Sequence, residues 1–207
     1  SFEWQPRYDA ASELVCSVLS QHTSDINSNR AFKNLMTVFG SLDAIACAEV
    51  EEIENAIRMA GLFRVKATRI KAMLIHVLEE IGSFDLSFLS EMALDEAKAW
   101  LMRINGVGPK TAAIILCFSL GMPAMPVDTH IFRVARRLGF IEKKVTAEQA
   151  HDVLESMVKP EDVYSFHLYL INHGRRVCKA IIPRCDECVL AFGCPSKVHR
   201  YGTKKLG

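Results

Sequence analysis

NGVGPKTAA, at residues 105–113, joins two segments that have helical periodicity. Gly106 and Gly108 flank Val107, and Lys110 follows where an apolar helical pattern begins. Glycine adopts positive φ without strain and leaves backbone N–H groups exposed. The first turn of a helix adds unpaired N–H groups at the positive end of the helix dipole. The segment therefore predicts a tight hairpin that either holds one phosphate group or is a glycine-capped turn that binds nothing.

The surroundings of the hairpin exclude a nucleotide-binding loop of the Walker A type. In such a loop glycine precedes the lysine and a strand leads in. Here Pro109 precedes Lys110, and the helical pattern LDEAKAWLMRI at residues 94–104 leads in. The expected unit is therefore helix, hairpin, helix.

Helical periodicity extends over most of the chain, and alternating strand patterns are absent. In residues 8–21, for example, Leu14, Val18 and Leu19 share one helical face. The pattern predicts an all-α fold of about ten helices with short connections. The expected helical segments are residues 8–21, 29–40, 41–61, 65–82, 94–104, 111–120, 128–140, 146–158 and 161–178.

Charge is distributed unevenly along the chain, although the net charge is only +1. Residues 1–129 hold 11 Lys/Arg against 16 Asp/Glu, whereas residues 130–207 hold 14 against 8. A basic lobe of this kind suits a polyanionic partner, although a chance surface imbalance would look the same. The change in charge follows a break that contains two prolines, which predicts two domains. The expected domains are a helical barrel over 9–123 and a basic domain over 124–207 that includes residues 1–8.

The composition is that of an ordinary soluble domain, with 50% hydrophobic and 24% charged residues. No apolar run reaches the ~18 residues that a membrane span requires. The start of the sequence has no signal-peptide pattern. We therefore expect a cytoplasmic protein without a membrane partner, associated with the nucleoid if its source is bacterial or archaeal.

Four of the seven cysteines lie close together near the end of the chain. The spacing is Cys178-x6-Cys185-x2-Cys188-x5-Cys194. Two disulfides are not expected in a cytosolic chain. Four thiolates in one short loop suit either a zinc ion or a [4Fe–4S] cluster, and the C-x2-C pair is common to both.

The hairpin, a second segment and the cysteine spacing together resemble one family. INGVGPKTAAIIL at residues 104–116 and MPVDTHIFRVARRLGF at residues 125–140 are similar to the helix-hairpin-helix DNA glycosylases of the endonuclease III type. The resemblance implies a two-lobed fold, with a six-helix barrel lobe and an iron–sulfur cluster lobe. It favours a [4Fe–4S] cluster over zinc, held by Cys178, Cys185, Cys188 and Cys194.

The same resemblance implies an enzyme of base excision repair. A DNA glycosylase with abasic-site lyase activity would remove damaged bases, of the oxidised-pyrimidine class, and cleave the strand by β-elimination. Its partner would be double-stranded DNA that contains a damaged base or an abasic site, bound by a monomer.

Two residues match the catalytic positions of that family. Lys110 would attack the sugar and form a Schiff base, and Asp128 would assist as a base or stabilise developing positive charge. The helix dipole at Lys110 disfavours a protonated amine, and partial burial of the side chain would act in the same direction. The alternative is that Lys110 contacts a phosphate and that Asp128 only caps the next helix.

The resemblance also implies which residues meet DNA. In the segment SQHTSD, residues 20–25, a side chain fills the gap left by a flipped nucleotide, and in GLF, residues 61–63, a leucine intercalates as a wedge. On local sequence, SQHTSD is also compatible with a polar turn in which Ser24 or Asp25 caps the next helix. GLF is equally compatible with an apolar contact after a glycine cap. The expected DNA-contacting residues are Gln21, His22, Asp25, Leu62, Gly106, Val107, Gly108, His130, Lys179 and Arg184.

Two other functions remain open from sequence. A mismatch or uracil glycosylase would share the fold, but its monofunctional members lack a lysine at the position of Lys110. A non-catalytic iron–sulfur module that binds DNA would keep the hairpin and the cysteines without needing Lys110 and Asp128 together. Borohydride trapping on abasic DNA separates a lyase from such a module.

Overall fold

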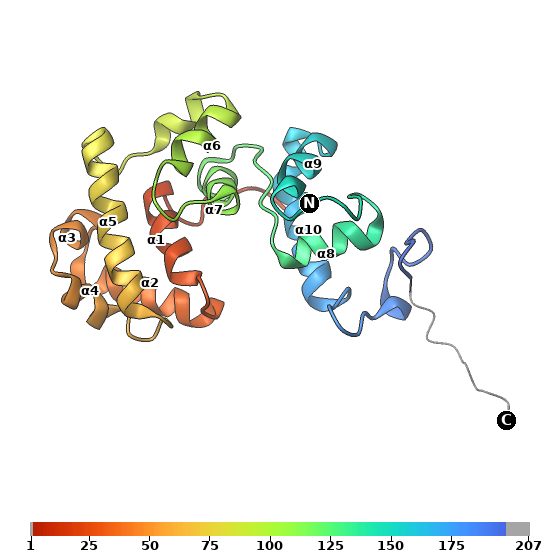
Figure 1. The fold of residues 1–207 in the computed structure, drawn as a ribbon, viewed down its shortest axis with the longest axis horizontal. Helices are drawn as coiled ribbons and strands as arrows, with labels where there is room; N and C mark the ends of the chain where they lie inside the picture. Colours follow the sequence, from red (N-terminus) through yellow and green to blue (C-terminus); the bar gives the residue numbers. More distant parts are fainter. Residues whose placement is uncertain (1, 198–207) are drawn as a thin grey trace. The chain divides into compact units, whose positions relative to one another are not determined.

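The computed structural model describes residues 2–197, and every regular element in this range is helical (Figure 1). This confirms the predicted all-α class. The α-helices are α1 (Ala10–Ser20), α2 (Asp25–Phe39), α3 (Leu42–Cys47), α4 (Val50–Ala56), α5 (Phe63–Ile81), α6 (Leu94–Met102), α7 (Pro109–Ile114), α8 (Thr129–Leu138), α9 (Gln149–Met157) and α10 (Val163–Arg176). Short 3-10 turns lie at Ser87–Glu91, Pro160–Asp162 and Cys185–Glu187, and a π-helical turn lies at Ile115–Ser119.

The chain folds as two compact units. The first unit comprises residues 4–124 and contains α1 to α7, and the second comprises residues 2–3 and 125–197 and contains α8 to α10. The last ten residues of the expected basic domain, 198–207, lie outside the described residues. No helix among residues 2–197 is long and apolar enough to cross a membrane.

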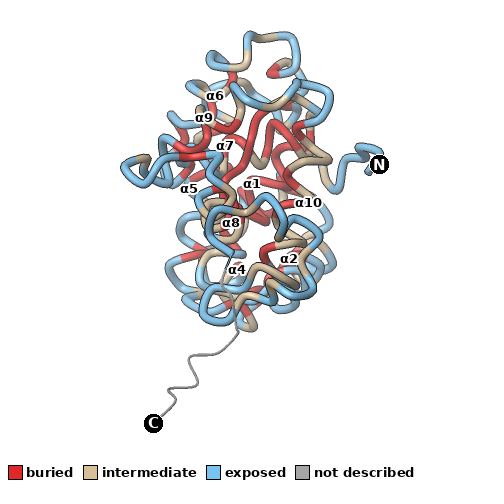
Figure 2. The backbone as a smooth tube through the Cα atoms, turned by 90° about the vertical axis from the view of Figure 1, so that its right-hand side faces the viewer, coloured by how far each residue is buried: buried red, intermediate tan, exposed pale blue. Residues whose placement is uncertain are grey.

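Helix α1 lies in the core of the first unit. It packs against α2, α5 and the π-helical turn that follows α7. Leu14, Val15 and Leu19 have no exposed surface, and the burial of this segment can be followed in Figure 2. Only four residues connect α1 to α2. Because α1 is buried, this short loop is anchored to the core at its first end.

The single helix expected over residues 41–61 is wrong, because the structure breaks it into α3 and α4. Glu49 begins α4 as its N-cap, and Glu52 completes a reciprocal capping box with it. Such a box satisfies two helix N–H groups locally and makes a new helix start favourable. Helix α4 then ends at Ala56, five residues before the glycine that the periodicity suggested as its end.

In the second unit, α8 packs closely against α10. Gly174 makes this approach possible, because a Cβ atom there would lie 2.9 Å from the His130 Cβ atom. Ile131, Val134 and Ala135 are fully buried along the same side of α8. The contact fixes the start of α8, where His130 and the N-cap Asp128 lie.

Candidate functional site

The expected hairpin is formed between α6 and α7. Gly106 has a φ of 88°, a conformation that side chains rarely adopt, and Val107 turns inward with 7% of its surface exposed. Gly108 has a φ of −100° and is the N-cap of α7 without any capping side chain. Of the two glycines, which both allow a positive φ, only Gly106 adopts one. At Gly108 the missing side chain instead leaves open space beside the backbone.

The hairpin offers backbone donors. Within the described part of the chain, the N–H groups of Gly106 and Gly108 donate to no backbone oxygen, whereas the N–H group of Val107 donates to Ile104 at 3.0 Å. Pro109 takes the first position of α7, where a missing N–H costs nothing. An anion near this turn would meet free amides and the start of a helix.

Lys110 is the second residue of α7, and its side chain is exposed. The partial burial considered from sequence as a second influence on this amine is therefore not found in the free protein. Pro109 and the turn before it hold the lysine at the outer side of the hairpin, while Ala112 and Ala113 face the core. Among residues 2–197 no hydrogen-bond or ion-pair partner of Lys110 is found, so its amine is free to meet a ligand.

Asp128 is the N-cap of α8. Its Oδ1 atom accepts a hydrogen bond of 2.7 Å from the backbone N–H of Ile131, which confirms the capping role considered from sequence. The side chain is half-buried, and its Oδ2 atom has no recorded partner in the described range. One oxygen thus fixes the carboxylate while the other remains available for a proton or a charge.

His130 is the second residue of α8 and is fixed from two sides. Its Nδ1 atom lies 3.2 Å from a guanidinium nitrogen of Arg133, and Gly174 packs against its Cβ atom. The same Arg133 side chain donates to the carbonyl of Cys178 at 3.0 Å. Asp128 and His130 belong to the second unit, and Lys110 belongs to the first.

The two segments expected to enter DNA form neighbouring loops in the first unit. A Cβ atom at Gly61 would lie 3.4 Å from the carbonyl oxygen of His22 and 3.6 Å from the Oγ1 atom of Thr23. His22 and Leu62 have φ values of 53° and 58°, and no other non-glycine residue among 2–197 has a positive φ. Each such conformation costs on the order of 1 kcal/mol, and strain of this kind concentrates at functional sites.

The exposed groups of these loops differ in how they are held. Leu62 begins α5 as its N-cap and exposes 61% of its surface. His22 is exposed, whereas Gln21 is half-buried and its Oε1 atom accepts a 3.0 Å bond from Arg69. Asp25 is the exposed first residue of α2, and Ser24 rather than Asp25 caps that helix.

Sequence reasoning missed Lys66, which lies beneath the two loops. Its surface is only 2% exposed, and its amine donates to the Leu19 carbonyl at 2.7 Å and to the Thr23 hydroxyl at 2.6 Å. Burial lowers the pKa of this amine from its ordinary value. The missed signal was its spacing, since Lys66 lies four residues before Ile70 on the apolar face of α5.

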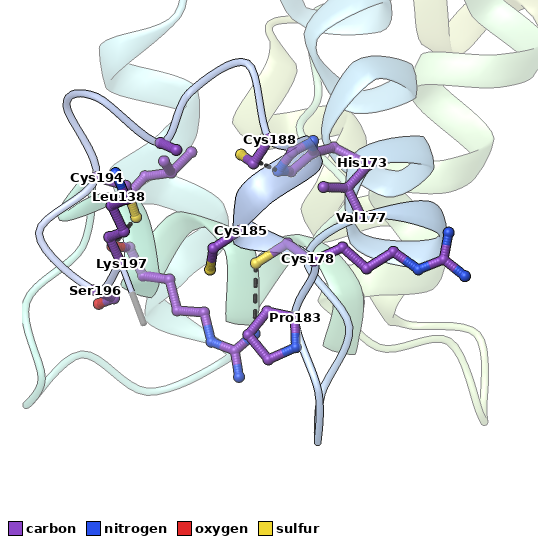
Figure 3. Close-up of a pocket in the computed structure, with 13 residues that line it drawn as sticks. Leu138, His173, Val177, Cys178, Pro183, Cys185, Cys188, Cys194, Ser196 and Lys197 are labelled. Carbon is purple, nitrogen blue, oxygen red and sulfur yellow. Dashed lines mark hydrogen bonds between the residues drawn. The ribbon is translucent and has the colours of Figure 1, made fainter. Parts of the chain in front are cut away.

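The four clustered cysteines line one pocket in the second unit, together with Arg137 and His173 (Figure 3). Arg137 donates to the Cys178 sulfur at 3.4 Å, and the His173 Nε2 atom lies 3.7 Å from the Cys188 sulfur. Burial lowers the pKa of the His173 imidazole from its ordinary value. Among the described residues, no three His, Cys, Asp or Glu side chains form a group that could hold a single metal ion.

The chemistry of this pocket suits an anionic iron–sulfur centre. All four donors are thiols, the ligand type that such clusters require. Arg137, Arg184 and Lys197 also line the pocket and can balance the negative charge of four thiolates. Cys185 begins the 3-10 turn Cys185–Glu187 and Cys188 is its C-cap, with its N–H donating to the Cys185 carbonyl at 3.2 Å; both cysteines line the pocket.

The two basic residues expected to contact DNA from this loop are both exposed. The Lys179 side chain is exposed, and its carbonyl accepts a 2.6 Å bond from Arg137. Arg184 forms an ion pair of 3.4 Å with Glu187. An anion that binds Arg184 would therefore have to compete with this carboxylate, an exposed pair of little net strength.

Comparison with known proteins gives consistent matches. The Arabidopsis thaliana protein named as a DNA glycosylase is 35% identical over 187 residues, which are 86% of this chain and 64% of the plant protein. Endonuclease III of Thermotoga maritima is 34% identical over 182 residues, 87% of this chain and 80% of that enzyme. The chain thus spans less than two thirds of the plant relative.

Solved structures and the family assignment agree with these relatives. A trapped covalent intermediate of endonuclease III with DNA superposes with a TM-score of 0.79 at 28% identity, over 95% of this chain and 88% of that one. This likeness confirms the fold that the resemblance implied. Residues 15–160 match a superfamily described as HhH-GPD base excision DNA repair proteins. The chain therefore belongs to the HhH-GPD superfamily of base excision DNA repair proteins.

Proposed function

We propose that this chain is a DNA glycosylase with abasic-site lyase activity. It acts as a monomer on double-stranded DNA and removes damaged bases of the oxidised-pyrimidine class. The observation that carries the proposal is the exposed amine of Lys110, free of partners in the described range, at the start of the hairpin helix in a member of this superfamily. Endonuclease III, to which this chain is similar, has been solved as a trapped covalent intermediate with DNA.

Lys110 is the proposed nucleophile. Its neutral amine attacks C1′ of the damaged nucleotide, the glycosidic bond breaks, and the base leaves with the bonding electrons and takes up a proton. The bound nitrogen loses one proton, the C1′–O4′ bond of the sugar breaks and O4′ takes up a proton, which leaves a protonated Schiff base. The Schiff base acidifies the C2′ proton, so its removal expels the 3′ phosphate, and water then releases Lys110.

Asp128 is the proposed partner in proton transfer. Its Oδ1 atom is held by the Ile131 amide, so Oδ2 is the atom that would accept a proton from the attacking amine. A negative charge also stabilises positive charge that develops on the sugar. The hairpin amides around Gly106 and Gly108 would hold a backbone phosphate, a contact that positions DNA without reading its sequence.

The remaining predicted contacts are proposed to act around this centre. Leu62 and His22 would enter the duplex, with Gln21 and Asp25 beside them, since flipping a base costs a few kcal/mol and inserted side chains offset part of it. His130, Lys179 and Arg184 would contact phosphates from the second unit. The two units would correspond to a helical barrel domain, 9–123, and a basic cluster domain, 124–207 with 1–8.

Cys178, Cys185, Cys188 and Cys194 are proposed to hold a [4Fe–4S] cluster. When bound, the cluster would cross-link the loop that carries Lys179 and Arg184. The protein should then be yellow-brown as purified, with about four irons per chain. Colourless protein with stoichiometric zinc after anaerobic preparation would contradict this assignment.

Removal of one ligand should affect the loop as a whole. We expect Cys188→Ser to lower iron content, to destabilise the second unit in thermal unfolding and to weaken DNA binding together. Cys47→Ser, outside the loop at an exposed cysteine, is the matched control and should leave all three unchanged. Full iron content and unchanged binding in Cys188→Ser would count against the ligand role.

The wedge role of Leu62 predicts a difference between duplex and single strand. Leu62→Ala should slow excision from a paired lesion by on the order of tenfold, because opening the stack is costly there. Excision from the same lesion in single-stranded DNA should change little. Val65→Ala, another exposed apolar residue on α5, is the control. Equal losses on both substrates would reduce Leu62 to a helix cap.

Base release and borohydride trapping test the proposed function directly. The expected result is excision of an oxidised pyrimidine from duplex DNA and a covalent adduct with abasic DNA in the presence of borohydride. Excision without an adduct would favour a monofunctional mismatch or uracil glycosylase. DNA binding with neither activity would favour a non-catalytic module.

A further inference from the structure

The buried lysine of α5 contacts both loops that are proposed to enter DNA. Lys66 lies in the first turns of α5, and its backbone N–H donates to the carbonyl of Leu62, the N-cap of that helix, at 3.1 Å. Its side chain then crosses to the other loop, where it donates to Leu19 at 2.7 Å and to Thr23 at 2.6 Å. One residue, four positions after Leu62, therefore holds both the end of α1 and the loop that carries His22.

The Leu19 contact also caps a helix. The last carbonyls of α1 have no partner within the helix, and a cation at this end interacts favourably with the helix dipole. Thr23 in turn donates from its hydroxyl to the Gln21 carbonyl at 3.3 Å. The amine thus holds the loop from beneath at two points, on either side of His22.

A buried ammonium is a costly way to fill space. No carboxylate partner of Lys66 is found among the described residues, and its side chain has 2% exposed surface. An apolar side chain of similar length would avoid the loss of hydration. The amine contributes directional hydrogen bonds, which hold a carbonyl and a hydroxyl at fixed positions. Apolar contacts would not fix these groups.

The backbone supports the same conclusion. His22 and Leu62 are the two positive-φ residues, and the two loops touch at Gly61. Strained conformations persist only where the surroundings fix them. We propose that Lys66 is a positioning residue that joins the two loops into one preformed surface, so that His22 and Leu62 enter the duplex together. This inference rests on the proposed function.

Lys66→Met tests the inference, with Lys71→Met as its matched control. Lys71 lies on the same helix and also donates to a backbone carbonyl at 2.7 Å, that of Ala48. Single-turnover excision is measured on one lesion in duplex and in single-stranded DNA. Lys66→Met should lower the duplex-to-single-strand ratio on the order of tenfold or more, as misplacement by about 1 Å does. Lys71→Met should leave the ratio unchanged.

Thr23→Val keeps the inference testable if Lys66→Met folds poorly. It removes one acceptor and leaves the Leu19 contact, so the ratio should fall in the same direction by a smaller factor. Amide hydrogen exchange of residues 20–24 should be faster in both variants and not in Lys71→Met. An unchanged ratio in Lys66→Met and Thr23→Val overturns the inference.

Trapping of the parent protein on abasic DNA, both as duplex and as single strand, separates the two proposals. If the parent forms an adduct with neither substrate, the proposed function fails, and the exchange measurement still decides whether Lys66 holds the loop. If the parent forms an adduct and the exchange of residues 20–24 is the same in Lys66→Met, only the positioning role fails.

Discussion

Lys110→Gln is expected to abolish the borohydride adduct and to reduce base excision on the order of 10⁴-fold or more, as removal of a nucleophile does. An amide cannot form an imine, so no trapped species remains. Binding to abasic duplex should be nearly retained, because the hairpin donors at Gly106 and Gly108 are backbone groups. Gel analysis of the adduct, single-turnover excision and a binding titration measure the three quantities.

Lys98→Gln is the control for this variant. Lys98 lies on α6, before the same hairpin, and pairs with Asp95 at 3.9 Å. The substitution removes the same charge from the same region, so it should lower binding slightly and leave the adduct unchanged. An undiminished adduct in Lys110→Gln would rule out Lys110 as the nucleophile, whatever the control does.

Asp128→Asn should slow excision by on the order of 10²-fold, the scale of general acid–base catalysis. Asparagine caps helices about as well as aspartate, so the bond from Ile131 can remain while the charge and the proton acceptor are lost. Excision is measured under single-turnover conditions, and thermal unfolding is recorded for the same samples.

Asp9→Asn supplies the matched control, because Asp9 caps α1 through the same kind of bond, accepting from Ser12 at 2.8 Å. Both variants should lose similar, small amounts of stability. Only Asp128→Asn should lose activity. If its turnover stays within a few-fold of the parent, Asp128 is a helix cap and no more.

The helical class and the hairpin could be predicted because their signals are local. Apolar residues recur with helical periodicity within each segment, and the glycines of NGVGPKTAA indicate the turn between two such segments. The family, and with it a base-excision-repair enzyme, is confirmed by the match over residues 15–160 and by the endonuclease III relatives. The damaged base and the role of each site residue stay predictions.

Other features escaped because they depend on packing or on competing local bonds. The break between α3 and α4 arises from a capping box. Its two glutamates also suit the interior of an acidic helix, so the sequence did not indicate a new helix start there. The left-handed backbone at His22 and Leu62 could not be predicted, because neither residue is a glycine. A lysine is normally predicted to lie at the surface. The burial of Lys66 could be predicted only from its position on the apolar face of α5.

The exposure of Lys110 is a further difference with a physical reason. Partial burial was considered from sequence as one way to make this amine more reactive, whereas the hairpin exposes it to solvent. A bound duplex would have to supply the exclusion of water that the free protein lacks. Activation of Lys110 is therefore proposed to depend on DNA binding.

Mass mapping of the trapped adduct tests the central claim most directly. After reduction, nuclease treatment and trypsin digestion, a modified Lys110 blocks cleavage, so the added sugar fragment should appear on the peptide spanning residues 104–133. Fragmentation should place the added mass on Lys110 itself. An adduct on another lysine or on the N-terminal amine, with peptide 104–110 released unmodified, would contradict the account.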